Sequence, residues 1–84
     1  MSDRHAACLQ LLGATIRQYR RRQGLTLHDL ERMTDLSPSY LAQIERGERN
    51  ATVLSLIRIA DALDLPYTSF LEPLNTLRPS APPT

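Results

Sequence analysis

Apolar residues recur at helical spacing along nearly the whole chain, and no run alternates apolar with polar residues as a half-buried strand does. This period predicts five helical segments and no strand. The first helix runs from Asp3 to Gln23 and ends at Gly24. We expect Gly13 to weaken its middle, so that its first turns fray. The inward stripe of this helix consists of Leu9, Leu12, Ile16 and Tyr19.

Capping residues predict where the second and fourth helices begin. Thr26 precedes a helical pattern over residues 27–34, and Thr52 precedes a longer one. A threonine at this place accepts a hydrogen bond from an otherwise unpaired backbone N–H of the first turn. The residues expected to face inward are Leu27, Leu30 and Met33 in the second helix and Val53, Leu56, Ile57, Ala60 and Leu63 in the fourth.

The C-terminal part of the chain gives weaker signals. Pro66 begins a short fifth helix that continues to Leu71, and Pro73 interrupts it. Residues 78–84 are rich in proline and lack large apolar side chains. We therefore expect a flexible tail there.

Residues 36–47 form the segment that says most about function. Ser37 can cap a third helix, Pro38 fits its first position, and Gly47 can end it in a left-handed conformation. Leu41 and Ile44 face inward at a spacing of three residues. The outward residues are Ser39, Tyr40, Gln43 and Arg46. A short, capped helix with a polar outer face is what the major groove of DNA accepts.

Composition limits the possible functions. The chain of 84 residues makes one domain, and its single cysteine excludes an internal disulfide. It has no apolar run long enough to span a membrane and no signal-peptide pattern, which predicts a cytoplasmic protein. The net charge of +1 argues little for nucleic acid, but every basic residue is arginine. Arginine is the side chain best suited to bidentate contacts with phosphate and guanine.

No other chemistry is indicated. His5 and His28 lie far apart without the spacing of metal ligands, and Cys8 is interpreted as a small residue on the first helix. There is no glycine loop of the kind that cradles phosphate, and no base near a nucleophile. The sequence predicts no enzyme, no metal, no cofactor, no small-molecule ligand and no membrane partner.

Three motifs at specific spacing resemble the lambda-repressor/Cro-like family, also called the XRE family. They are Gly24-Leu25-Thr26-Leu27-His28-Asp29-Leu30, Leu36-Ser37-Pro38-Ser39-Tyr40-Leu41 and Ile44-Glu45-Arg46-Gly47. The resemblance implies an all-α domain of five helices, with a helix-turn-helix at helices 2 and 3. We expect this domain over residues 11–72, an N-terminal extension of the first helix over 1–10, and a proline-rich tail over 73–84. Asp35 replaces a frequent turn glycine and is expected to adopt the left-handed conformation.

The resemblance also implies site residues for double-stranded DNA, with the third helix in the major groove. Arg20 and Glu45 match a pair that in family members forms a partly buried salt bridge between the first and third helices and orients the recognition helix. Arg21 and Arg22 either complement the dipole of the first helix or approach phosphate. The expected base-reading residues are Ser39, Tyr40, Gln43 and Arg49, and the expected phosphate contacts are Thr26, Arg46, Asn50 and Thr52.

The C-terminal half has more large apolar residues than the core of so short a chain obviously holds. They either cover the bottom of the core or form a two-fold dimer contact, and we favour the dimer because an exposed apolar patch needs a partner. The predicted contact residues are Leu54, Phe70, Leu71 and Leu74.

The predicted function is that of a dimeric repressor binding a palindromic operator. Two alternatives remain. The hexad from Glu45 to Asn50 resembles the restriction–modification controller proteins, which activate or repress. The same fold also serves as a protein-binding adaptor or antitoxin, which the modest net charge would suit.

Overall fold

The structure is a computed structural model that describes residues 3–79. Within this range it contains four α-helices, two 3-10 helices and no strand, which confirms the predicted all-α class. The elements in chain order are α1 (Asp3–Arg22), α2 (Leu27–Thr34), α3 (Pro38–Glu45), α4 (Val53–Leu63), η1 (Tyr67–Phe70) and η2 (Glu72–Leu77).

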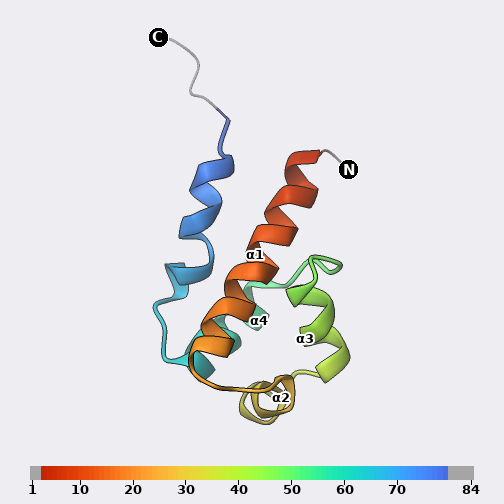
Figure 1. Ribbon diagram of the computed structural model, residues 1–84, viewed down its shortest axis with the longest axis vertical. Coiled ribbons are helices and arrows are strands. Elements are labelled where there is room, and N and C mark those ends of the chain that lie inside the picture. The colour runs from red at the N-terminus through yellow and green to blue at the C-terminus, as the bar shows by residue number, and fades with distance from the viewer. Residues whose placement is uncertain (1–2, 80–84) are drawn as a thin grey trace.

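The long helix α1 organises the molecule (Figure 1). α3 packs on one side of it, η2 runs beside it on the other, and α2 lies at its C-terminal end. One apolar core fills the space between the helices, and its buried members come from every element except η2. They are Leu12, Ile16, Leu30, Leu41, Ile44, Ile59, Ala60, Leu63 and Phe70.

The three predicted caps are confirmed. Thr26, Ser37 and Thr52 each accept a hydrogen bond from a backbone N–H of the following helix's first turn. At the other ends, Gly47 has a φ of 74° and Asp35 a φ of 60°, both in the left-handed region. A glycine adopts this conformation without strain, and an aspartate tolerates it better than most residues. The short helices therefore begin and end where the sequence indicates.

Gly13 lies at a close contact between α1 and α3. α1 continues through this residue without a break, so the predicted weak point is wrong. Gly13 is buried, and a Cβ at this position would overlap the backbone carbonyl oxygen of Ile44. The glycine is needed because the C-terminal turn of α3 approaches the backbone of α1 too closely for any side chain.

Two predicted core residues lie in solvent. Met33 is 50% exposed and Val53 is 71% exposed, so both inward assignments are wrong. Val53 is the first residue of α4, and this helix buries Ser55 and Ile59 in addition to the predicted Ala60 and Leu63. The helical period therefore predicts the buried face of α4 correctly except in its first turn.

The fifth helix is two successive 3-10 helices. Pro73 stands in the first turn of η2, where a missing N–H costs no helical hydrogen bond. Residues 73–77 belong to η2, which packs on α1, and Leu74 is partly buried against the core. The tail predicted over 73–84 is therefore wrong for these residues, while residues 80–84 lie outside the described range. No helix within residues 3–79 is long and apolar enough to cross a membrane.

Candidate nucleic-acid interface

α2 and α3 form a helix-turn-helix. The N–H of the left-handed Asp35 donates to the carbonyl oxygen of Glu31 at 2.8 Å, and the hydroxyl of Thr34 accepts from the N–H of Leu36 at 3.2 Å. These bonds satisfy the polar backbone of the turn. α3 then begins at Pro38 and buries Leu41 and Ile44 completely, so its opposite side is free to face a ligand.

The outer side of α3 carries three of the expected DNA contacts in one row. Ser39 and Arg46 are exposed, and Gln43 is half-buried between them. Residues four and three positions apart lie on the same face of a helix, so these side chains are neighbours. The Arg46 guanidinium donates to Glu48 at 3.0 Å, and both groups are more than half exposed. Such an exposed pair is weak, which leaves Arg46 available to another anion.

Tyr40 does not project freely outward, and this expectation is wrong. Its hydroxyl donates to Ser55 Oγ at 3.0 Å and accepts from the backbone N–H of Thr52 at 3.3 Å, while its ring packs against the core. The Arg49 guanidinium lies 5.5 Å from the ring centroid. Burial disfavours the phenolate, but the hydrogen bonds with Ser55 and Thr52 and the charge of Arg49 outweigh burial and lower the pKa of Tyr40. Tyr40 therefore links α3 to the start of α4.

The two threonines expected at phosphate use their hydroxyls as helix caps. Thr26 Oγ1 accepts from Asp29 N at 3.0 Å, and Asp29 in return accepts from Thr26 N at 2.8 Å. Thr52 Oγ1 accepts from Ser55 N at 3.0 Å. Asn50 is exposed in the loop before α4. These residues lie at or near the N-terminal ends of α2 and α4, where unpaired N–H groups and the helix dipole favour an anion.

Arg20 and Glu45 form the predicted ion pair. Arg20 Nε lies 2.7 Å from Glu45 Oε2, and Arg20 Nη2 donates to Glu45 Oε1 at 2.9 Å. Their side chains are only 9% and 5% exposed. Arg20 Nη1 also donates to the carbonyl oxygen of Leu25 at 2.7 Å. The hydrogen bonds to Glu45 outweigh the cost of burial and raise the pKa of Arg20, so the pair fixes α3 on α1 in its charged form.

The predicted dimer residues divide into two groups. Phe70 is completely buried, with its ring centroid 6.0 Å from that of Tyr19, so its assignment to an interface is wrong. Phe70 ends η1 inside the core, whereas Tyr67, the first residue of η1, is 55% exposed. Leu54 and Leu71 are 71% and 50% exposed, as a contact surface requires.

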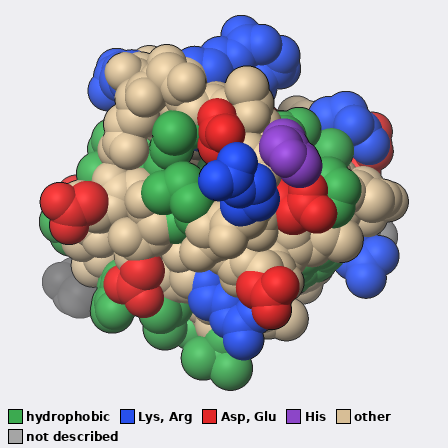
Figure 2. Space-filling model, turned by 90° about the horizontal axis from the view of Figure 1, so that it is seen from below, with side chains coloured by type: hydrophobic (Ala, Val, Ile, Leu, Met, Phe, Trp, Pro, Cys, Tyr) green, Lys and Arg blue, Asp and Glu red, His purple; other side chains and the backbone are tan. Residues whose placement is uncertain are grey.

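Charges of both signs are mixed on the end of the molecule formed by α2. Figure 2 shows acidic, basic and histidine side chains interspersed there, with further basic side chains at the margin of the view. This distribution agrees with the formal net charge of +1. A local cluster of arginines, not the charge of the whole chain, must therefore attract an anion. Within residues 3–79, no three His, Cys, Asp or Glu side chains are grouped to hold a metal ion.

The sequence missed one basic residue at this site. Arg17 lines a small hollow together with Arg20 and Glu45, beside the first residue of α2 and the outer side of α3. Its spacing of four residues from Arg21 was the available signal, because it places both arginines on one side of α1.

Known proteins match the chain over most of its length. The helix-turn-helix family matches residues 16–70. The HTH-type transcriptional regulator SutR of Escherichia coli strain K12 is 37% identical over 71 residues, which are 84% of this chain and 40% of SutR. The chain thus spans less than half the length of that relative.

Solved structures of similar size share the fold. The restriction–modification controller protein C.AhdI from Aeromonas hydrophila superposes with a TM-score of 0.75 at 31% identity, covering 76% of this chain and 97% of that one. The controller protein C.Esp1396I, solved as a tetramer in complex with its natural 35-base-pair operator, superposes with a TM-score of 0.72 at 31% identity. That match covers 83% of this chain and 92% of the controller. The chain belongs to the helix-turn-helix family of DNA-binding transcription regulators, in agreement with its resemblance to lambda-repressor/Cro-like proteins.

Proposed function

We propose that this regulator is a homodimer that represses transcription by occupying a palindromic operator. The observation that carries the proposal is the polar row of α3, exposed on a helix that a bidentate ion pair holds on α1. A helix held in one orientation can present the same side chains to every operator copy, which sequence recognition requires. Two such helices related by a two-fold axis would read half-sites about one helical turn, or ~34 Å, apart.

Base reading is assigned to Ser39, Gln43, Arg49 and Tyr40. Gln43 can bond both the acceptor and the donor on the major-groove edge of adenine. Arg49 lies over the ring of Tyr40, so these two residues would act together. Tyr40 would contact DNA through the part of its ring that the core leaves uncovered, because its hydroxyl is bonded to Ser55 and Thr52.

Phosphate contacts are assigned to Thr26, Arg46, Asn50 and Thr52. Because both threonine hydroxyls already cap helices, and that of Thr52 also donates to Ser55 Oγ, we assign the phosphate bonds to the adjacent N–H groups of the first helical turns. Such contacts set the register of the protein on the duplex without reading its sequence.

Dimerisation is assigned to the exposed leucines Leu54 and Leu71, with Leu74 at the edge of the core. Their exposure supports the assignment, since large apolar side chains in solvent favour a partner. The controller protein C.Esp1396I, which is a tetramer on its operator, gives independent support for an oligomer.

A controller of a restriction–modification system is a second candidate. Its support is the match to C.AhdI, which covers 97% of that short protein. A controller can activate as well as repress, so the distinction concerns the promoter and not the fold. A protein-binding adaptor has no comparable support.

One experiment tests the proposed function. Bound sequences are selected from a random duplex pool, and the winning sequence is footprinted while the protein's mass is measured by sedimentation. We expect a palindromic consensus bound by a dimer. Failure to enrich any sequence, or binding of a monomer to a single half-site, would overturn the proposal.

A further inference from the structure

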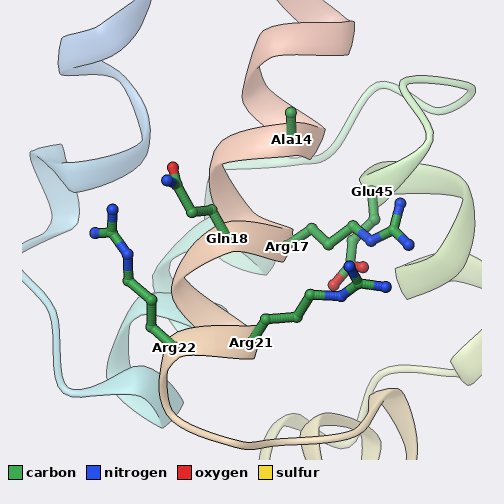
Figure 3. A pocket seen from close by; sticks show the side chains of 6 residues that line it. All are labelled: Ala14, Arg17, Gln18, Arg21, Arg22 and Glu45. Carbon is green, nitrogen blue, oxygen red and sulfur yellow. The ribbon is translucent and has the colours of Figure 1, made fainter.

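Arg17 and Arg21 form a basic ridge on the second half of α1. Neither is among the contacts assigned in the proposed function, and of the two only Arg21 is considered for phosphate from the sequence. Both residues are exposed and stand one helical turn apart. Figure 3 shows their side chains projecting from the same side of α1, toward Glu45 at the end of α3, whereas Gln18 and Arg22 project from the other side. The ridge therefore faces the recognition helix.

The positive charge of this ridge is not compensated. Glu45 is the acidic group that the two arginines face, but both of its oxygens already accept from Arg20. Among the described residues, neither Arg17 nor Arg21 forms an ion pair. The buried pair is neutral as a unit, so the ridge keeps its full charge.

The helix dipole does not explain both arginines. Arg21 lies in the last turn of α1, where a cation interacts favourably with the C-terminal carbonyls. Arg17 lies more than a turn from the end, and that effect falls off within the last turn. A solvated helix end would also not require the two side chains to project toward the same neighbour.

Two adjoining hollows connect the ridge to the predicted DNA-binding surface. Arg17 and Glu45 line both of them, so the hollows adjoin at these two residues. The larger, of about 570 Å³, extends over α1 and is lined by Ala14, Arg17, Gln18, Arg21, Arg22 and Glu45. The smaller, of about 180 Å³, reaches α2 and α3 and is lined by Arg17, Arg20, Leu27, Ala42, Glu45 and Arg46. A basic track thus leads from the start of α2 along α1.

We propose that Arg17 and Arg21 bind the phosphodiester backbone of the duplex that α3 reads, beyond the phosphates held at the start of α2. This inference rests on the proposed DNA-binding mode. Residues four apart on a helix have Cβ atoms about 5–6 Å apart, and the phosphates of one strand recur about every 3.4 Å along the duplex axis, so two long side chains at this spacing can reach phosphates of the same strand. The planar guanidinium can bond a phosphate with two parallel N–H groups. Neither arginine reads a base, so both strengthen binding to any sequence.

The test compares the salt dependence of binding by the full chain and its variants. The Arg17→Gln/Arg21→Gln variant removes both charges, and Arg17→Lys/Arg21→Lys retains them. Arg58→Gln removes one exposed arginine from α4, outside both hollows, and controls for the effect of losing a positive charge elsewhere on the surface. The probes are the duplex selected from the random pool and a scrambled duplex of equal length. Circular dichroism checks that each variant is folded.

We expect the glutamine variant to bind both duplexes at least roughly tenfold more weakly. Its plot of log affinity against log salt should be shallower by about 0.9 for each phosphate that the variant no longer neutralises. The lysine variant and Arg58→Gln should keep slopes near that of the original chain. An unchanged slope in the glutamine variant, or weaker binding confined to the selected duplex, would overturn this inference.

These outcomes separate the inference from the proposed function. Suppose that the original chain prefers the selected duplex and that the glutamine variant keeps the same salt slope. This result would refute phosphate binding by the ridge and would leave sequence recognition by α3 intact. Equal binding of the selected and scrambled duplexes, with a shallower slope in that variant, refutes sequence reading and supports the ridge. If the original chain binds neither duplex, both fail, and the ridge would have to serve a different partner such as an acidic protein.

Discussion

The helix-turn-helix and the C-terminal segment are held in the fold by different means. Both α2 and α3 have side-chain caps, and the end of α3 is fixed by the ion pair of Arg20 and Glu45. η1 and η2 have no side-chain cap and rely on the packing of Phe70 and Leu74. Directional bonds hold the helix-turn-helix, to which we assign DNA reading, in one orientation, while burial of apolar surface positions the C-terminal segment, to which we assign dimerisation.

Among changes near the helix-turn-helix, breaking the ion pair of Arg20 and Glu45 should lower the free energy of unfolding most. Arg20→Ala leaves the Glu45 carboxylate buried without its partner, and we expect a loss of about 3–5 kcal/mol in the free energy of unfolding. Urea denaturation followed by circular dichroism measures it. Arg21→Ala, an exposed neighbour on α1, is the control and should change stability by less than about 0.5 kcal/mol. Equal stability of the two variants would show that the pair does not hold α3.

In the C-terminal segment, two adjacent residues separate the effect of core packing from that of dimer contact. Phe70→Ala removes a completely buried ring and should cost about 3–5 kcal/mol. Leu71→Asp alters a half-exposed residue, so we expect little change in unfolding at low protein concentration but disruption of the dimer in sedimentation. A Leu71→Asp variant that still sediments as a dimer would remove Leu71 from the interface.

A methyl group at Gly13 tests the close contact of α1 with α3. Gly13→Ala places a Cβ against the carbonyl oxygen of Ile44, and we expect a loss of about 1–3 kcal/mol despite the better helix propensity of alanine. The exposed neighbour provides the control, because Ala14→Ser should cost only about 0.5 kcal/mol. Stabilisation by Gly13→Ala in a thermal melt would contradict the contact.

The smallest effect concerns the pH dependence of the α2 cap. The backbone N–H and hydroxyl of Thr26 lower the pKa of Asp29 in the folded state. The ionised Asp29 carboxylate therefore stabilises the folded state above the ordinary pKa of an aspartate. This stabilisation is lost as pH falls through the lowered pKa of Asp29 in the folded state. We expect the original chain to exceed Asp29→Asn in stability at about pH 5, and the difference to shrink toward about pH 3. A difference that stays constant with pH would show that the charge of Asp29 does not matter.

The sequence predicted the fold where local chemistry decides the structure. Thr26, Ser37 and Thr52 begin their helices because a cap depends on the residue itself and the next turn. Asp35 and Gly47 adopt the left-handed conformations that these residue types tolerate.

The failures concern residues whose environment depends on distant segments. Gly13 is required because the backbone of α3 lies against it. Tyr40 does not project outward because its hydroxyl bonds to the Ser55 hydroxyl and the Thr52 backbone N–H. Phe70 is buried because its ring packs in the core beside Tyr19 of α1, a contact with a segment about 50 residues away that the local pattern does not indicate. Within the candidate site, the sequence resemblance placed the ion pair of Arg20 and Glu45 correctly.

The most direct test of the central claim measures how Gln43 contributes to base discrimination. Affinities of the original chain and Gln43→Ala are determined for the selected duplex and for duplexes with one base pair changed in each half-site. We predict that Gln43→Ala loses about 1–3 kcal/mol on the selected duplex and no longer discriminates at one position per half-site, while its salt slope is unchanged. Unchanged affinity and discrimination in a folded variant would contradict the claim that the outer row of α3 reads DNA.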